Sequence, residues 1–220
     1  AYLKNVDMFA CITEFQKKKL IEAGYDKNKI TVIPNSIDAP CSYTPTSGEY
    51  IAYIGRLSYE KGYDLLVEVA RKHPEIKFRF AGAQREQKNT DIPSNVEFAG
   101  YLQKDKLLEF IQKARFIVIP SRCYEGFPMA ILEAACHGKP AIAPNHGGFT
   151  EIIGQGENAI GKLFEPGNTD DLDKQIAELW NNQTLTEELG EKAFRKLKKH
   201  YDSEVVYKQW ETLFSKLKNS

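Results

Sequence analysis

Short apolar runs alternate with helix-periodic segments along most of this chain, and that alternation limits its fold more than any other feature. The predicted strands are residues 50–54, 77–81, 95–98, 116–119, 141–143 and 159–163. The predicted helices among them are residues 60–72, 104–114 and 129–136. Strands joined through helices are typical of parallel sheets, because a parallel crossover needs about a dozen residues or more. The sequence therefore predicts an α/β fold with a Rossmann-like parallel sheet flanked by helices.

Both ends of the chain add further elements. Residues 6–12 and 29–33 are predicted strands around a helix at 13–23, and the last third is predicted to be helical. There Thr169 is the expected N-cap of one helix, and Ser203 opens another. Prolines, serines and threonines concentrate at 34–48, which is the best linker in the sequence. The predicted parts are residues 1–34, 35–48, 49–202 and 203–220.

Composition excludes several classes of protein. The chain is 42% hydrophobic, and its 30 basic residues balance 30 acidic ones, so neither a disordered chain nor a nucleic-acid partner is expected. No apolar run approaches the roughly 20 residues of a membrane span. The chain starts at Ala1 without Met or a signal-peptide pattern, so we expect a fragment of a longer cytoplasmic protein. Four cysteines without a CxxC pair indicate reduced thiols and no structural metal.

Two cations follow the strand at 50–54. Arg56 comes directly after Gly55, and Lys61 lies at the mouth of the next helix. Ligands of open α/β sheets bind at the carboxyl ends of strands, so both side chains are predicted to point at one site. Two converging cations suit a diphosphate. The alternative is a pair of solvated surface cations, and no Walker loop is present.

The helix predicted at 129–136 is apolar nearly all round. Pro128 suits its first position, and Gly138 followed by Pro140 suits its end. Glu133 is its one charged residue, and an unpaired buried charge is very costly. The partner of Glu133 is predicted to be either a protein cation, of which Lys139 is near in sequence, or a ligand hydroxyl.

Glu125 and Gly126 precede that helix. Free amides and the helix dipole favour a phosphate at a helix start. Gly126 allows the backbone to approach a ligand closely. We expect Glu125 to accept hydrogen bonds from sugar hydroxyls beside such a phosphate. The alternative is a carboxylate that only stabilises the helix start.

Two other motifs are weaker. The stretch at 145–151, with Gly147 and Gly148, is predicted to be a loop that either contacts a ligand or only turns the chain. Asp171 and Asp173 could suggest metal-binding carboxylates. They lie in the first turns of a predicted helix, where acidic residues are expected, so a metal role is discounted.

Seven stretches between residues 33 and 151 form a set. They are Ile33-Pro34-Asn35-Ser36-Ile37-Asp38, Gly55-Arg56-Leu57 through Lys61-Gly62, Phe80-Ala81-Gly82, Val96-Glu97-Phe98-Ala99-Gly100, Pro120-Ser121, Glu125 through Glu133, and Gly147-Gly148-x-x-Glu151. In this order they resemble the donor-binding half of family 4 glycosyltransferases, retaining enzymes with the GT-B fold. The resemblance continues more loosely to the C-terminus.

The resemblance implies a role for each matching residue. The implied catalytic residues are Glu125, Arg56 and Lys61. The implied nucleotide-sugar contacts are Gly55, Arg56, Lys61, Tyr101, Leu102, Glu125, Gly126, Phe127, Pro128, Met129, Ala130 and Glu133. Arg56 and Lys61 would hold the diphosphate, Glu133 would accept from ribose hydroxyls, and Glu125 would touch the transferred sugar. The backbone at 101–102 would face the base. No metal or other cofactor is implied, because these cations would offset the leaving-group charge.

The resemblance also implies a function for a longer protein. It would transfer a sugar from a nucleotide sugar, UDP-linked rather than GDP-linked, to an acceptor bound by an N-terminal domain. Residues 1–34 would be a remnant of that domain, 35–48 a linker, 49–202 the donor-binding domain and 203–220 a helix crossing back. This half alone is expected to bind the donor and transfer nothing. The alternative is a stand-alone nucleotide-sugar-binding or partner module of a split glycosyltransferase.

Two departures from the family pattern are mild. The chain has Asn35-Ser36-Ile37-Asp38 where the family often has Asn-Gly-Val-Asp, and Gly82-Ala83-Gln84 where many members have Gly-x-Gly. Both are expected to shift donor fit without changing the fold. A nicotinamide oxidoreductase is excluded because no Gly-x-Gly-x-x-Gly follows the first strand.

The closing helix carries Trp210 and Phe214 on an apolar stripe. If it crosses to a missing domain, it exposes an apolar patch in this chain. We therefore expect dimerisation through that patch, and a monomer by light scattering at high concentration would contradict it. Polysaccharide biosynthesis is a common role in the family. Membrane contact is expected only through the missing half, at the inner face.

Overall fold

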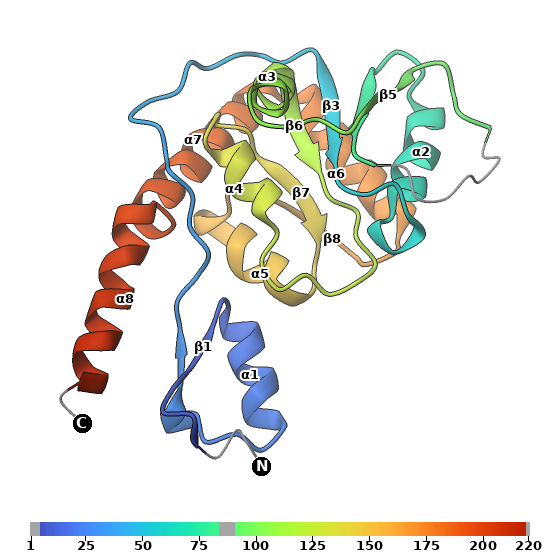
Figure 1. The fold of residues 1–220 in the computed structure, drawn as a ribbon. Coiled ribbons are helices and arrows are strands. Elements are labelled where there is room, and N and C mark those ends of the chain that lie inside the picture. The colour runs from blue at the N-terminus through green and yellow to red at the C-terminus, as the bar shows by residue number, and fades with distance from the viewer. Residues whose placement is uncertain (1–4, 84–90, 219–220) are drawn as a thin grey trace.

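The computed structural model describes residues 5–83 and 91–218. Outside the described residues lie 1–4 and 219–220, at the two ends of the predicted parts. Gln84, which belongs to the second departure from the family pattern, also lies outside them. The main body is a parallel sheet with the strand order β5-β4-β3-β6-β7-β8 (Figure 1). Its strands are β3 (Tyr50–Ile54), β4 (Phe78–Ala81), β5 (Val96–Gly100), β6 (Ala114–Val118), β7 (Ala141–Pro144) and β8 (Gly161–Phe164). The predicted parallel sheet is confirmed.

Helices cover both faces of this sheet. They are α2 (Tyr63–Lys72), α3 (Asp105–Lys113), α4 (Met129–Ala135), α5 (Gly147–Ile153), α6 (Thr169–Asn181) and α7 (Gln183–His200), with a short 3-10 turn, η4 (Gly156–Asn158). Successive side chains of a strand point to opposite faces. Ile51 and Tyr53 accordingly pack in the core beneath α2 and α6, whereas Tyr50 and Ala52 pack with α3, α4 and α5. Both faces are buried, which accounts for the nearly continuous apolar strands.

Four local expectations differ from the structure. The helix predicted at 60–72 is a 3-10 turn, η3 (Tyr59–Lys61), followed by α2, because Gly62 between them has φ +68°. The stretch at 145–151, predicted as a loop, contains the start of α5. Pro128 is the N-cap of α4 rather than its first residue. Asn168, not Thr169, caps α6, because its side chain accepts from the amides of residues 170 and 171.

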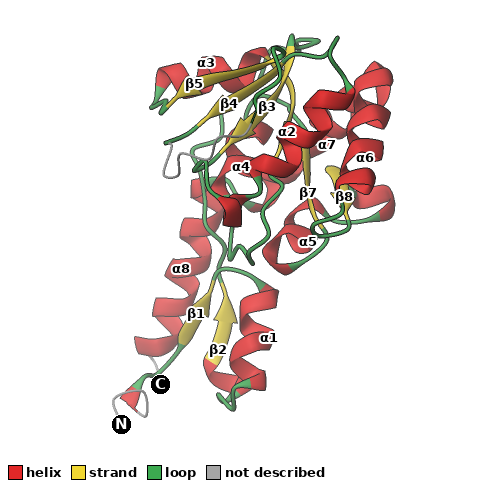
Figure 2. Cartoon of the chain, turned by 90° about the vertical axis from the view of Figure 1, so that its right-hand side faces the viewer, coloured by secondary structure: helices red, strands yellow, loops and turns green. Residues whose placement is uncertain are grey.

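A small unit precedes the sheet. Strands β1 (Phe9–Cys11) and β2 (Ile30–Val32) pair in parallel and are joined through α1 (Glu14–Glu22) and a 3-10 turn, η2 (Lys27–Lys29). Buried Thr13 caps α1, as its hydroxyl accepts from the Gln16 amide at 3.3 Å. Figures 1 and 2 show this unit standing off one end of the main body, with α8 (Ser203–Lys218) running in the same direction.

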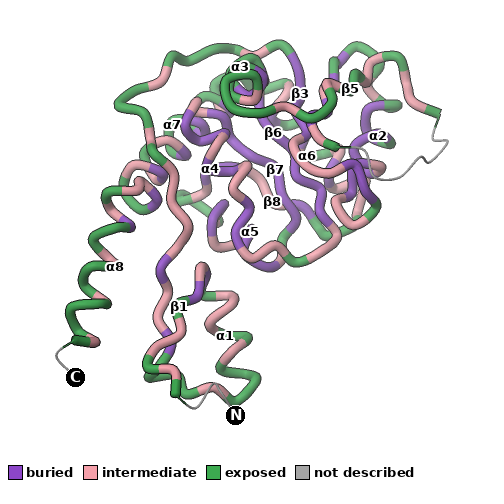
Figure 3. Tube along the Cα trace, in the orientation of Figure 1, coloured by how far each residue is buried: buried purple, intermediate pink, exposed green. Residues whose placement is uncertain are grey.

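Helix α8 leaves much of its apolar stripe uncovered (Figure 3). Among its described residues only Val206 is buried, and Tyr207 and Phe214 are 64% and 55% exposed. Trp210 stacks on Phe214 with 5.8 Å between ring centroids. The exposed patch agrees with expectation, and dimerisation through it stays a prediction. Within residues 5–83 and 91–218 no helix is long and apolar enough to cross a membrane.

The segment at 35–48 is held against the main body by a buried lysine. Lys139, 3% exposed, donates from Nζ to the carbonyl of Thr46 at 2.9 Å and to its hydroxyl at 2.6 Å. Burial lowers the pKa of Lys139 to about 8, because desolvation disfavours the charged form.

The Lys139 pKa gives the first prediction. Between pH 8 and about 10 the unfolded chain still binds a proton that folded Lys139 has released, so the free energy of unfolding rises with pH. This contribution reaches at most about 1.4 kcal/mol per pH unit. Urea denaturation from pH 7 to 10 should show the rise in the wild type and its loss in Lys139→Met. Equal slopes for the two proteins would contradict the assignment.

Candidate functional site

The strand order creates a switch point at one edge of the sheet, between the loops that follow β3 and β6, and we call this place the crevice. The chain runs from β3 outward through β4 and β5, and then from β6 outward through β7 and β8 on the other side. The loops that follow β3 and β6 therefore diverge, and such switch points are where open α/β sheets bind ligands. These two loops are residues 55–62 and 119–128, and they contain most of the predicted site residues.

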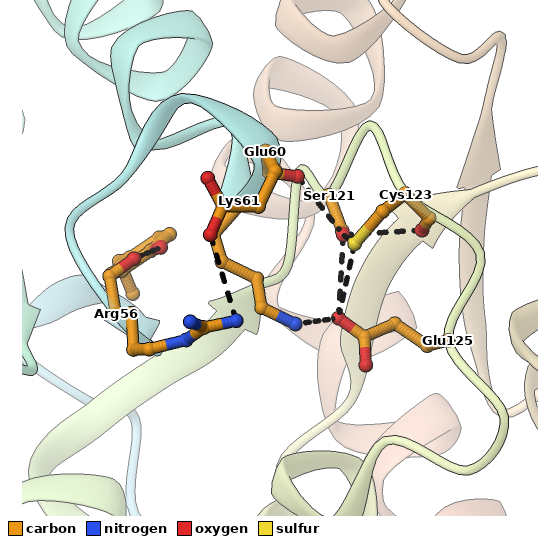
Figure 4. A network of polar contacts seen from close by, with 7 residues as sticks. Arg56, Glu60, Lys61, Ser121, Cys123 and Glu125 are labelled. Atoms are coloured by element: carbon orange, nitrogen blue, oxygen red, sulfur yellow. Dashed lines mark hydrogen bonds and ion pairs between the residues drawn. The ribbon is translucent and has the colours of Figure 1, made fainter.

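An ion pair joins the two loops. Lys61 Nζ donates to Glu125 Oε1, and the same oxygen accepts from the Ser121 hydroxyl at 3.3 Å (Figure 4). Both charged side chains are about one-fifth exposed. The Glu125 carboxylate is thus held by Lys61 across the crevice. Glu125 was expected either to contact a sugar or to stabilise the start of α4, and neither expectation included this ion pair.

Arg56 lies in the same loop after β3 as Lys61 (Figure 4). Its guanidinium is 3.5 Å from Glu60, and its side chain is 42% exposed. Its backbone carbonyl accepts a 2.6 Å hydrogen bond from the buried Tyr53 hydroxyl, which fixes the loop. Figure 4 shows the Arg56 and Lys61 side chains near each other, with Arg56 the more exposed cation; that both point at one ligand site stays a prediction.

Close backbone contacts hold both loops in place. A Cβ added to Gly62 would lie 1.9 Å from the carbonyl oxygen of Pro120. Gly148 of α5 donates its N–H to the Glu125 carbonyl at 3.0 Å, and a Cβ there would lie 2.4 Å from the Gly126 carbonyl oxygen. The paired glycines at 147–148 thus give space for the loop that carries Glu125.

The Glu133 carboxylate has no hydrogen bond or ion pair in the described part of the chain. Lys139, the cation weighed as its partner, donates to Thr46 instead. Burial raises the pKa of Glu133, because desolvation disfavours its charged form. The ligand-hydroxyl alternative therefore remains for this carboxylate.

The other predicted contacts lie along the same edge. Gly55 follows β3, and Tyr101 and Leu102 follow β5, with Tyr101 69% exposed and Leu102 half-buried. Gly126, Phe127, Pro128, Met129 and Ala130 form the entry to α4, with Phe127 buried. The space beside Gly126 that a ligand was expected to use is filled by the side-chain amide of Gln16, whose Nε2 would be 2.4 Å from an added Cβ.

Several residues near the crevice had no predicted role. Arg122 forms a two-pronged ion pair with Asp64 at 2.7 and 2.8 Å, which ties the loop after β6 to α2. His146 lies edge-on to Tyr124 at 5.0 Å, and burial lowers its pKa. Cys123 lies 3.2 Å from the Ser121 hydroxyl (Figure 4). These loops come together only in the folded chain, so local sequence patterns did not predict a role for these residues.

The acidic doublet has structural partners. Asp173 pairs with His73 at 2.6 Å and with Lys72 at 3.2 Å, and Asp171 accepts from the Glu165 amide at 2.7 Å. In residues 5–83 and 91–218 no three His, Cys, Asp or Glu side chains gather as a metal site would need.

Comparison with known proteins identifies the family. The family described as "Glycosyl transferases group 1" matches residues 42–196. This chain belongs to that family. The group 1 glycosyltransferase domain is 32% identical over 193 residues to an uncharacterized glycosyltransferase, MJ1178, of Methanocaldococcus jannaschii, covering 85% of this chain and 53% of that protein. It is 30% identical over 175 residues to the sulfoquinovosyl transferase SQD2 of Arabidopsis thaliana, covering 77% and 32%.

Solved structures agree on the fold. The crystal structure of Anabaena Alr3699/HepE in complex with UDP superposes with a TM-score of 0.84 at 19% identity, covering 96% of this chain and 64% of that one. The same protein in complex with UDP-glucose gives a TM-score of 0.81 at 20% identity, covering 95% and 64%. The group 1 domain thus has the expected GT-B Rossmann-like architecture. It spans about half the length of MJ1178 and less of SQD2.

Proposed function

We propose that this chain is the donor-binding half of a retaining glycosyltransferase, and that it binds a nucleotide sugar carried by UDP rather than GDP. The observation that carries the proposal is the pair of cations, Arg56 and Lys61, beside Glu125 at the crevice. Two cations suit a diphosphate, and hydrogen bonds to a charged group contribute about 1.5–3 kcal/mol each. The UDP and UDP-glucose complexes of HepE, which has the same fold, favour a uridine nucleotide.

Each polar group then has one task. Arg56 and Lys61 neutralise the diphosphate, and Glu133 accepts hydrogen bonds from the ribose hydroxyls. The backbone at 101–102 faces the base. Glu125 positions the transferred sugar and is not assigned as a nucleophile. Most of the phosphate affinity is attributed to the two cations, since α4 is only seven residues long.

The proposed transfer breaks the bond between the anomeric carbon and the β-phosphate oxygen, and the nucleoside diphosphate leaves with the electron pair. An acceptor hydroxyl forms the new bond on the same face, and its proton goes to the departing phosphate. Arg56 and Lys61 stabilise the charge that develops there, so no metal is required. Acceptor binding and hexosyl transfer are proposed for the longer protein, while the 220-residue chain alone binds the donor without transferring it.

Isothermal titration calorimetry of the chain with UDP and then GDP, without added metal, tests this proposal. We expect UDP to bind and Arg56→Ala and Glu133→Ala each to weaken it by at least tenfold. Binding of GDP alone would reassign the nucleotide. Binding of neither nucleotide by the wild-type chain would contradict a donor site in this chain.

Replacement of Glu133 is predicted to raise the stability of the ligand-free chain and to lower its affinity for UDP. Glu133→Gln removes a half-buried, unpaired carboxylate, so at pH 7 it should stabilise the ligand-free chain by about 1 kcal/mol and raise its melting temperature by about 2–4 °C. The same change should weaken UDP binding, because one of the two acceptor oxygens becomes an N–H donor and the charge that strengthens the bonds to ribose is lost. Glu188→Gln, at an exposed position on α7, is the matched control and should change neither quantity. Equal UDP affinity for Glu133→Gln and wild type would contradict the ribose contact.

A further inference from the structure

The first turn of α1 lies against the loop that carries Glu125. The rings of Phe15 and Tyr124 stack with 5.5 Å between centroids. The Phe15 amide donates to Glu151 Oε2 at 3.3 Å, which ties the start of α1 to α5. A segment more than a hundred residues earlier in the chain therefore forms part of the wall beside the proposed sugar position.

Gln16 in this turn has a defined orientation. Its Oε1 accepts from the Ile12 amide at 3.1 Å, which only the oxygen end of the amide can do. Nε2 must then face away from Ile12. It lies beside Gly126, at 2.4 Å from the point where a Cβ would be.

The nitrogen end of this amide is an unused donor. Gln16 is half-buried, and its Nε2 has no acceptor within the described ranges 5–83 and 91–218. The residue before Gly126 is Glu125, whose carboxylate only accepts hydrogen bonds. A donor beside Gly126 and an acceptor on the residue before it are thus both available at the entry to α4. Neighbouring hydroxyls of a sugar can satisfy both, since each hydroxyl donates and accepts.

We propose that Gln16 is a specificity-determining residue, and that its Nε2 donates a hydrogen bond to a hydroxyl of the transferred sugar. The inference rests on the proposed function, because it takes the donor sugar to lie beside Glu125. It also assigns a reason for glycine at position 126. A side chain there would push the Gln16 amide away and break its bond to Ile12.

Methionine is the decisive replacement for Gln16. It keeps the length and most of the volume of the side chain and removes both N–H donors together with the oxygen that accepts from the Ile12 amide, so it separates hydrogen bonding from packing. A polar site that loses its hydrogen-bonding partner discriminates less between sugars. Gly126→Ala leaves Gln16 in the chain and displaces its amide, so it should act in the same direction.

The experiment is calorimetric titration of the 220-residue chain with UDP and with UDP-glucose, UDP-galactose and UDP-N-acetylglucosamine. The quantity compared is the affinity for the tightest of these UDP-sugars relative to that for UDP. We expect Gln16→Met and Gly126→Ala to lower this ratio by about threefold to tenfold, the range of one hydrogen bond. For Gln16→Met, UDP affinity itself should stay within about twofold of wild type. Gln112→Met, at an exposed position on α3, should leave both unchanged.

The outcomes separate the two proposals. If Gln16→Met leaves the ratio of UDP-sugar affinity to UDP affinity unchanged, the role of Gln16 is overturned. The same holds if the ratio falls in Gln16→Ala but not in Gln16→Met, because that loss comes from packing. Failure of the wild-type chain to bind UDP or any UDP-sugar overturns the proposed function and this inference with it. If the wild-type chain binds UDP and Gln16→Met leaves the affinity ratio unchanged, only the inference about Gln16 is overturned.

Discussion

Replacement of Lys61 by methionine is expected to weaken UDP binding by about 10- to 100-fold. Lys61 would contribute a charge-assisted bond to the diphosphate, and such bonds account for about 1.5–3 kcal/mol. The substitution also leaves Glu125 without its ion-pair partner at the crevice, so a carboxylate would face the phosphate unscreened. Calorimetry with UDP at constant ionic strength measures the loss.

The Lys61–Glu125 pair allows a double-mutant cycle. Glu125→Gln alone should change UDP affinity by less than about threefold, because it removes a charge that Lys61 already compensates. In the Lys61→Met background the same change should recover part of the lost affinity. Lys174→Met, at an exposed position on α6, is the control. Additive effects of the two substitutions would contradict the pairing as described.

Gly62→Ala is expected to be the most destabilising single substitution at the site. Gly62 has φ +68°, and its Cβ would lie 1.9 Å from the carbonyl oxygen of Pro120. An alanine therefore requires both an unfavourable backbone conformation and movement of the loop after β6. We expect a loss of about 3 kcal/mol or more in the free energy of unfolding, as strained backbone and overpacking combine.

Gly167→Ala separates the two causes. Gly167 has φ +78°, and nothing lies within 4 Å of its added Cβ, so its replacement should cost only the conformational part, about 1–2 kcal/mol. Urea denaturation of the two variants gives the difference. If both lose the same stability, the close contact with Pro120 is not a constraint.

The fold was largely predictable because it depends on local patterns. A strand such as β3, at Tyr50–Ile54, is apolar throughout because both faces of the sheet are covered, and its bounds matched the prediction. The errors fall where single residues change the backbone. Gly62 interrupts the helix predicted from residue 60, and the paired glycines at 147–148 suggested a loop where α5 begins.

The site was predictable in part. Arg56, Lys61 and Glu125 follow strands whose carboxyl ends must share one edge, so their convergence follows from the strand pattern. That Lys61 pairs with Glu125 depends on the strand order, which places β3 beside β6. Local patterns do not contain that order.

The contribution of α1 could not be predicted from spacing. Gln16 is 110 positions before Gly126, and neither residue has a local pattern that points to the other. Their contact depends on how the unit of β1, α1 and β2 packs against the main body. Glu151 belongs to a motif found in the sequence, yet its hydrogen bond to the Phe15 amide is visible only in the folded chain.

Amide hydrogen exchange with and without UDP tests most directly whether the nucleotide occupies this crevice. The account predicts slower exchange in the UDP-bound chain at three segments, residues 55–62, 101–102 and 125–133, with α8 unchanged. Protection confined to α8 or to the linker at 35–48, with none in the loops after β3 and β6, would contradict it.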